Sequence, residues 1–190
     1  MVRIIIFASG SGTNAENIIR YFKDNSKVEI RAVLSNKKEA KVLERANKYN
    51  IRTKSFSRND FYETENILEY LKAEADLIVL AGFLWKVPEK IIDEFPNKII
   101  NIHPALLPNY GGKGMYGMNV HKAVVSNKES ETGITIHFVN KNYDEGAVIF
   151  QIKVALTNED TPESVAGKIH ILEQDNFPRV IEEVIRMESS

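Results

Sequence analysis

The sequence predicts an α/β fold with a Rossmann-like, doubly wound and mostly parallel sheet, completed by a C-terminal β-hairpin and a closing helix. Apolar runs typical of buried strands alternate with helical patterns, and no linker or repeat interrupts them. The run DLIVLAGF at 76–83 is apolar on both faces, as parallel strands covered by helices on both sides are.

Each expected element has a local signature. Continuous β-rich runs predict strands, and apolar residues spaced by three and four predict helices. The expected strands are 2–8, 28–35, 51–56, 76–83 and 98–103, with a hairpin of 131–140 and 146–156. The expected helices are 15–24, 38–49, 61–74, 87–95, 120–128 and a closing segment of one or two helices. Pro88 is expected in the first turn of its helix, and Thr161 is expected to cap the closing one, with Pro162 at its first position.

Composition limits the classes of partner. The 25 Lys and Arg residues nearly balance the 26 Asp and Glu residues, so no excess of positive charge predicts a nucleic-acid partner. No apolar stretch approaches the length of a membrane span. The absence of cysteine removes disulfides and thiolate metal clusters, and it fits a reducing, cytoplasmic location. At 190 residues, the chain suits a single domain, or at most two very small ones.

The segment IINIHPALLP at 99–108 carries the first candidate site. Asn101 and His103 are two apart in an expected strand, so they share a face, and Pro104 ends that strand. In doubly wound sheets, ligands bind at the carboxyl ends of the strands. An imidazole there can shuttle protons and an amide can donate to an oxyanion. The alternative is a core histidine bonded to a backbone carbonyl.

The loop ASGSGTNA at 8–15 carries the second candidate site. It nearly matches the dinucleotide fingerprint G-x-G-x-x-G/A, but the next strand ends at Asn36 instead of an acidic residue, which disfavours nicotinamide binding. Small residues before a helix N-terminus suit a phosphate. A tight turn with Thr13 or Asn14 as the helix cap is the alternative.

The third stretch, NKNYDEGAVIFQ at 140–151, places Asp144 in a turn. Its carboxylate could orient the imidazole of His103 and raise the pKa of that ring, which completes the needs of acyl transfer to an amine. No serine lies in a G-x-S-x-G elbow, so direct attack by the amine is favoured over a covalent intermediate. A zinc site from His103, His137 and Asp144 has no supporting ligand spacing, and the apolar neighbours of His137 indicate a structural role.

Five motifs, in this order and spacing, resemble the phosphoribosylglycinamide formyltransferase family within the wider formyltransferase group. They are ASGSGTN, AGF at 81–83, NIHPALLP at 101–108, ETGITIHFV at 131–139 and DEGAVIFQ at 144–151. The resemblance implies formyl transfer from 10-formyltetrahydrofolate, as co-substrate, to the amine of 5′-phosphoribosylglycinamide in purine synthesis. It implies these two small molecules as partners, no metal, no nucleic acid, no membrane, and a monomer or homodimer.

The resemblance also implies the site residues. The catalytic residues map to Asn101, His103 and Asp144. The phosphate and ribose contacts map to Gly12, Thr13, Asn14 and Glu173. The folate contacts map to Leu84, Trp85, Lys86, Val87, Asn101, Asn140, Lys141, Asn142, Tyr143 and Asp144. A nucleotide-binding half at about 1–100 would then precede a catalytic, folate-binding half at about 101–190.

Two departures from the family pattern leave alternatives open. Many members have a basic residue where this chain has Trp85, so the folate contact there is expected to be stacking or backbone only. The glycine-rich stretch 109–119 is longer than the usual family loop. It could be a lid over the folate, with Lys113 at the glutamate tail, or an ordinary surface excursion.

Three other functions are alternatives. A formyltetrahydrofolate hydrolase would be expected to carry an extra N-terminal regulatory domain, and a methionyl-tRNA formyltransferase a C-terminal tRNA-binding domain. A non-catalytic nucleotide-binding module would use the same glycine loop. It would not need the set of Asn101, His103 and Asp144.

Overall fold

The computed structural model describes residues 1–188, and the chain divides into two compact units, Met1–Ile100 and Asn101–Ser190. The elements of the first unit are β1 (Val2–Phe7), α1 (Thr13–Phe22), β2 (Val28–Ser35), α2 (Lys41–Asn47), β3 (Arg52–Ser55), α3 (Arg58–Tyr62), α4 (Asn66–Glu74), β4 (Leu77–Leu80), α5 (Glu89–Glu94) and the start of β5 (Ile99–His103). None of the helices within residues 1–188 combines the length and apolar character that a membrane span needs.

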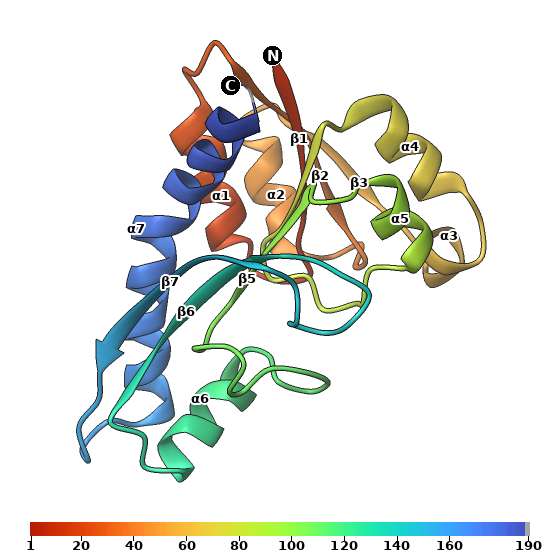
Figure 1. Ribbon diagram of the computed structural model, residues 1–190. Coiled ribbons are helices and arrows are strands. Elements are labelled where there is room, and N and C mark those ends of the chain that lie inside the picture. The colour runs from red at the N-terminus through yellow and green to blue at the C-terminus, as the bar shows by residue number, and fades with distance from the viewer. Residues whose placement is uncertain (189–190) are drawn as a thin grey trace. The chain divides into compact units, whose positions relative to one another are not determined.

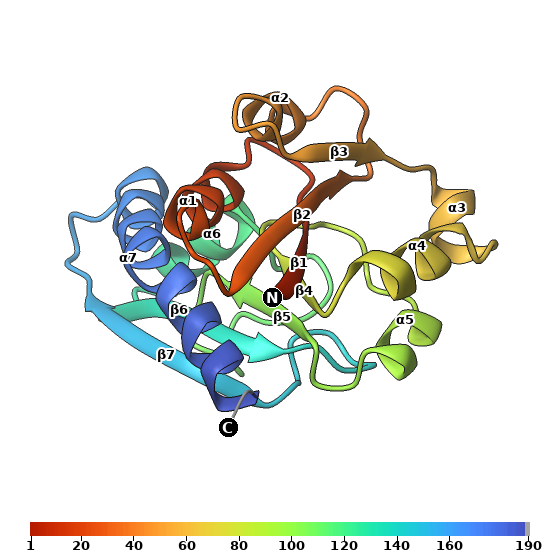
Figure 2. The same cartoon turned by 90° about the horizontal axis from the view of Figure 1, so that it is seen from above.

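The first unit is built around β1, whose central residues Ile4, Ile5 and Ile6 are completely buried. This strand pairs in parallel with β2 on one side and with β4 on the other, and β3 pairs in parallel with β2. Figures 1 and 2 show α1 and α2 on one side of these strands and α4 and α5 on the other. Both faces are therefore covered, which explains why the middle of β1 and the whole of β4 are apolar on both sides.

The second unit contains the end of β5, α6 (Met118–Ser126), β6 (Glu131–Phe138), β7 (Val148–Ala155) and α7 (Pro162–Glu188). The strands β6 and β7 form an antiparallel hairpin, and α7 lies alongside it (Figure 1). The predicted closing segment is one continuous helix, which begins at Pro162 and contains Pro178. The Ser164 N–H donates to Thr161 Oγ at 3.2 Å, so the predicted cap is confirmed.

Over residues 1–188, the strands form a seven-stranded sheet in the order β3-β2-β1-β4-β5-β6-β7. Parallel pairing in the first unit and the antiparallel hairpin in the second make it a mixed, mostly parallel sheet. The predicted α/β class, with its C-terminal hairpin and closing helix, is confirmed. The strand order reverses between β1 and β4, and ligands of such sheets bind outside the carboxyl ends of the strands at this point.

One segment expected to be a single helix, 61–74, is divided into α3 and α4. The Thr64 hydroxyl donates to the Asp60 carbonyl at 3.3 Å and accepts from the Asn66 N–H at 3.3 Å. These side-chain bonds replace the helical ones between the two elements, so the expectation of one helix is wrong.

Two further helix boundaries differ from those expected. The helix α2 is shorter than the expected 38–49, and the chain beyond it adopts a left-handed conformation at Asn50, with φ of 58°. A left-handed residue cannot continue a right-handed helix. Pro88 is the N-cap of α5 instead of a residue of its first turn.

Candidate active site

The second unit brings together the three residues predicted to act in catalysis. Asn101 and His103 lie on β5, and Asp144 lies in the connection between β6 and β7. His103 Nδ1 is 3.7 Å from Asp144 Oδ2, and Asn101 reaches the same carboxylate through His137. Four polar side chains from β5, β6 and one turn therefore form a single cluster.

His103 is buried, with 4% of its surface exposed. Its Nε2–H donates to the Tyr110 carbonyl at 2.7 Å, so in the neutral ring Nδ1 has no proton and faces Asp144. Burial lowers the pKa of His103, whereas the charge of Asp144 and the bond to Tyr110 act to raise it. The effect of burial is the largest, so the pKa of His103 is lowered. Asp144 acts to raise this pKa, as predicted, but the net effect favours the neutral imidazole.

Asp144 is positioned by its own backbone conformation and by a bond from the loop that contains Gly112. It adopts a left-handed conformation with φ of 54°, and its Oδ2 accepts the Gly112 N–H at 2.9 Å. Burial raises the pKa of this carboxyl, but contact with His137, the charge of His103 and the Gly112 N–H together lower it. Asp144 is therefore an anion at neutral pH.

The structure adds His137 to the cluster. Its Nδ1–H donates to the Phe138 carbonyl at 2.8 Å, and its Nε2 accepts from Asn101 Nδ2 at 3.1 Å. This nitrogen also lies 3.6 Å from Asp144 Oδ1. His137 is thus a core residue, as the sequence indicates, that also orients the amide of Asn101. Thr135 and His137 are two apart in a buried strand, which is the same signal that marks Asn101 and His103.

This cluster does not form a metal centre. Within residues 1–188, no group of three His, Asp or Glu side chains is placed to hold a metal ion.

The glycine loop of the first unit ends at the start of α1. Gly12 is the N-cap of this helix with φ of 78°, and no side chain among the described residues caps it. The alternative with Thr13 or Asn14 as the cap is therefore wrong. Arg45 supports the loop by donating from Nε to the Ser11 carbonyl at 2.8 Å. Thr13 and Asn14 occupy the first turn of α1, and the N-terminus of a helix is a favourable place for an anion.

The segment expected to bind folate in the first unit follows β4. Leu84 is 44% exposed and Val87 is buried. The ring of Trp85 packs against four other aromatic rings, those of Phe56, Phe61, Tyr62 and Phe83. The Tyr62 hydroxyl also donates to the Lys86 carbonyl at 2.8 Å. The indole therefore anchors the segment from within, and the exposed Leu84 and the backbone are left to meet a ligand.

Arg58 is a charged residue beside this segment that no sequence motif indicates. Its guanidinium carbon lies 4.9 Å from the centre of the Tyr62 ring and 5.7 Å from that of Trp85. A cation over two aromatic faces is held by the ring quadrupoles. This arrangement places a positive charge beside a position where many family members have a basic side chain. The sequence signal for it was weak, because Arg58 precedes Trp85 by almost thirty residues.

The remaining predicted contacts lie in the second unit. Asn140, Lys141, Asn142 and Tyr143 are exposed in the turn before Asp144, where the Asn142 N–H donates to Asn140 Oδ1 at 2.9 Å. Glu173 is half-buried in the middle of α7. Their roles as folate and ribose contacts stay predictions.

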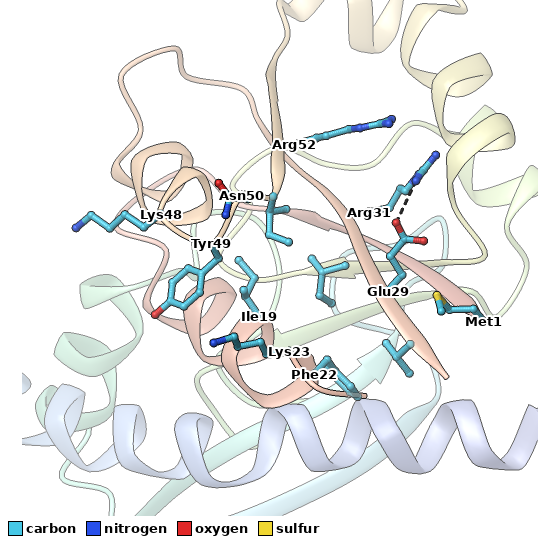
Figure 3. Close-up of a pocket in the computed structure, with 13 residues that line it drawn as sticks. Met1, Ile19, Phe22, Lys23, Glu29, Arg31, Lys48, Tyr49, Asn50 and Arg52 are labelled. Carbon is cyan, nitrogen blue, oxygen red and sulfur yellow. Dashed lines mark hydrogen bonds and ion pairs between the residues drawn. The ribbon is translucent and has the colours of Figure 1, made fainter. Parts of the chain in front are cut away.

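A separate pocket of about 540 Å³ lies in the first unit, between α1 and the chain entering β3 (Figure 3). Met1, Val28 and Arg52 line it at the starts of three strands, so it opens at the amino ends of the sheet. None of the predicted site residues lines it. It does not belong to the candidate active site.

The chain is similar to several known proteins in sequence and in structure. Residues 2–181 match a family model described as Formyl transferase. The chain is 36% identical over 174 residues to the chloroplastic phosphoribosylglycinamide formyltransferase of Arabidopsis thaliana, covering 88% of this chain. It spans 60% of the length of that relative and of the one from Vigna unguiculata.

A bacterial relative and a solved structure match over more of their length. Phosphoribosylglycinamide formyltransferase of Haemophilus influenzae is 36% identical over 187 residues, which cover 95% of this chain and 86% of the relative. The crystal structure of phosphoribosylglycinamide formyltransferase from Anaplasma phagocytophilum superposes with a TM-score of 0.88 at 34% identity. That superposition covers 97% of this chain and 87% of the solved one.

Proposed function

The chain belongs to the formyltransferase family, and on that premise we propose that it transfers the formyl group of 10-formyltetrahydrofolate to the amine of 5′-phosphoribosylglycinamide. The observation that carries the proposal is the cluster of Asn101, His103 and Asp144, with the histidine and the carboxylate 3.7 Å apart. The names of the relatives supply the acceptor, phosphoribosylglycinamide, and the formyl group that is transferred, whereas the folate donor is what the sequence resemblance implies.

The substrates would be held by the two sets of residues named above. The N-terminus of α1, with Gly12, Thr13 and Asn14, would bind the ribonucleotide phosphate, because the helix dipole favours an anion there. Glu173 would bind the ribose. The folate would lie against Leu84–Val87 and Asn140–Tyr143, with the guanidinium of Arg58 as a further cation for its carboxylates.

In the reaction, the amine nitrogen attacks the formyl carbon, and the carbonyl oxygen becomes an oxyanion. The Asn101 amide carries two N–H groups and His137 accepts only one, so the second can donate to this oxygen. The Nε2–H of His103 can donate as well, once the Tyr110 carbonyl releases it. The bond from the formyl carbon to folate N10 then breaks and tetrahydrofolate leaves.

The proton of the attacking amine must reach folate N10. His103 Nδ1 is unprotonated in the resting protein, and Asp144 is an anion beside it, so the pair can take up this proton together. The carboxylate stabilises the imidazolium that forms. The pair then returns the proton to N10, and both groups regain their resting states.

The test is a spectrophotometric assay of the purified chain with a 10-formylfolate donor, with and without the ribonucleotide. Deformylation of the donor that requires the ribonucleotide, with formylglycinamide ribonucleotide as product, is the expected result. Deformylation with water alone would contradict the proposal in favour of a hydrolase. Ribonucleotide binding without turnover would contradict it in favour of a binding module.

A further inference from the structure

Ser9 is a polar side chain in a place where the fold alone needs none. It follows β1 within the first unit and is 2% exposed. A buried hydroxyl is unfavourable unless it is hydrogen-bonded, and a small apolar side chain would fill the same volume. Its bonding partners therefore show what the hydroxyl does.

The hydroxyl connects the carboxyl ends of three strands. Ser9 Oγ donates to Asn36 Oδ1 at 2.7 Å, just after β2, and it accepts the Leu84 N–H at 3.0 Å, just after β4. The Ser9 N–H also donates to the Gly82 carbonyl at 3.0 Å. Backbone and side chain of one residue thus hold both ends of the turn from Gly82 to Leu84.

This turn needs such support because its own conformation is unusual. Gly82 has φ of 77°, a left-handed conformation, and the segment after it belongs to no helix or strand. The side chain of Leu84 is largely exposed, so packing does little to place its backbone. The bond from Leu84 N–H to Ser9 Oγ is therefore the contact that sets where the segment begins.

We propose that Ser9 is a positioning residue for the segment Leu84–Val87, and that it sets the geometry with which this segment meets the folate co-substrate. The proposal rests on the proposed function. Ser9 touches no reacting atom, and it acts through Leu84. Its loss would leave the Leu84 N–H and Asn36 Oδ1 without partners, so the segment would shift to reach other partners.

Trp85 supplies a readout that does not depend on catalysis. It is the only tryptophan of the chain and the residue next to Leu84. Its fluorescence and its quenching by acrylamide report how the segment is packed. A merely structural loss of stability would not move these signals in the folded protein under native conditions.

The experiment compares Ser9→Ala with the wild type and with Thr53→Val. Thr53 Oγ donates to Asn47 Oδ1 at 3.1 Å in the same unit, so its variant loses a side-chain hydrogen bond away from the segment. For Ser9→Ala we expect a KM for the formyl donor raised about tenfold, with kcat within about twofold, and stronger quenching of Trp85. Thr53→Val should change neither quantity.

A Ser9→Ala protein with wild-type donor KM and wild-type quenching would overturn the inference. Should Ser9→Ala fail to fold, Ser9→Cys keeps the shape of the side chain with a slightly larger atom that is a weaker donor and acceptor, and an intermediate shift of both readouts is expected. Wild-type values in Ser9→Cys would equally overturn it. If the wild type shows no turnover, altered quenching in the variant still supports the positioning role, although the proposed function has then failed.

Discussion

His103 Nδ1 and Asp144 Oδ2 face each other at 3.7 Å, and no proton lies between them. The one N–H of the neutral ring donates to the Tyr110 carbonyl, and the carboxylate accepts a hydrogen bond from the Gly112 N–H. Both contacts come from the loop that follows β5. The resting protein therefore holds a base and an anion side by side, ready for a proton that only the substrate brings.

The Asp144→Asn variant removes the anion and keeps the shape of the side chain. An amide cannot stabilise an imidazolium as a carboxylate does, so we expect kcat to fall about 100-fold or more while the KM of each substrate changes little. Steady-state kinetics with both substrates varied would measure this. A variant with at least half of the wild-type kcat would refute the role of Asp144.

The pH dependence of kcat/KM should have an acidic limb below pH 6.5, because burial lowers the pKa of His103 from that value and the neutral ring is the active form. Asp144 acts to raise the pKa of His103. Its replacement by Asn should therefore move the limb to still lower pH. A limb that moves upward in the variant would show that another group titrates.

The Arg58→Ala variant removes the cation over Trp85 and Tyr62. If this guanidinium meets the folate carboxylates, the KM for the formyl donor rises about five- to tenfold, with little change in the KM for the ribonucleotide. Arg58→Lys should recover part of the loss, since it keeps the charge without the planar group. Equal changes in both KM values would point to a general defect of folding instead.

The Gly12→Ala variant tests the phosphate loop. A Cβ at this residue would lie 2.7 Å from Val42 Cα, and the backbone is left-handed with φ of 78°. We expect the free energy of unfolding to fall by about 1–3 kcal/mol and the KM for the ribonucleotide to rise. Gly10→Ala is the matched control, because a Cβ there meets no atom within 4 Å. Similar losses in both variants would count against a special role for Gly12.

His121 should contribute to acid sensitivity. It is buried on α6, and among the side chains of residues 1–188 its Nδ1 is a buried nitrogen without a hydrogen-bond partner. Burial lowers its pKa below 6.5, so the unfolded chain takes up the proton first as pH falls. Stability from the neutral buried ring is present above pH 6.5 and is lost below it.

The His121→Leu variant should therefore lose less stability than the wild type between pH 7 and pH 5. Urea unfolding at both pH values measures the free energy of unfolding. The loss of stability that remains in the variant is attributed to His103, whose pKa is also lowered by burial. An undiminished pH dependence in the variant would exclude His121 as a source.

The strands were predictable because buried strands appear in the sequence as continuous apolar, β-rich runs. The run VEIRAVLS at 28–35 is a strand over the whole expected range, since an apolar β-rich segment of this length has few other solutions. The break at Thr64 was not predictable in the same way. The Thr64 hydroxyl bonds to backbone groups that would otherwise form helical hydrogen bonds over one turn. The spacing of apolar residues does not reveal such a bond.

Most residues of the candidate cluster were predictable from the sequence, but the direction of the pKa shift of His103 was not. Asn101, His103 and Asp144 stand out as polar residues in apolar or turn settings, and the fold brings them together. The apolar neighbours of His137 on its own strand indicate only a core position, whereas its partner Asn101 lies on another strand. The direction of the His103 pKa depends on how completely the ring is buried, which only the packed structure gives.

The most direct test of the proposed mechanism is the rate of formyl transfer to the ribonucleotide by the wild type and by His103→Ala, with both substrates saturating. We predict ribonucleotide-dependent turnover in the wild type and a fall of about 100-fold or more in the variant, with substrate binding kept. Near-normal turnover in His103→Ala would contradict the central role of the histidine and carboxylate pair.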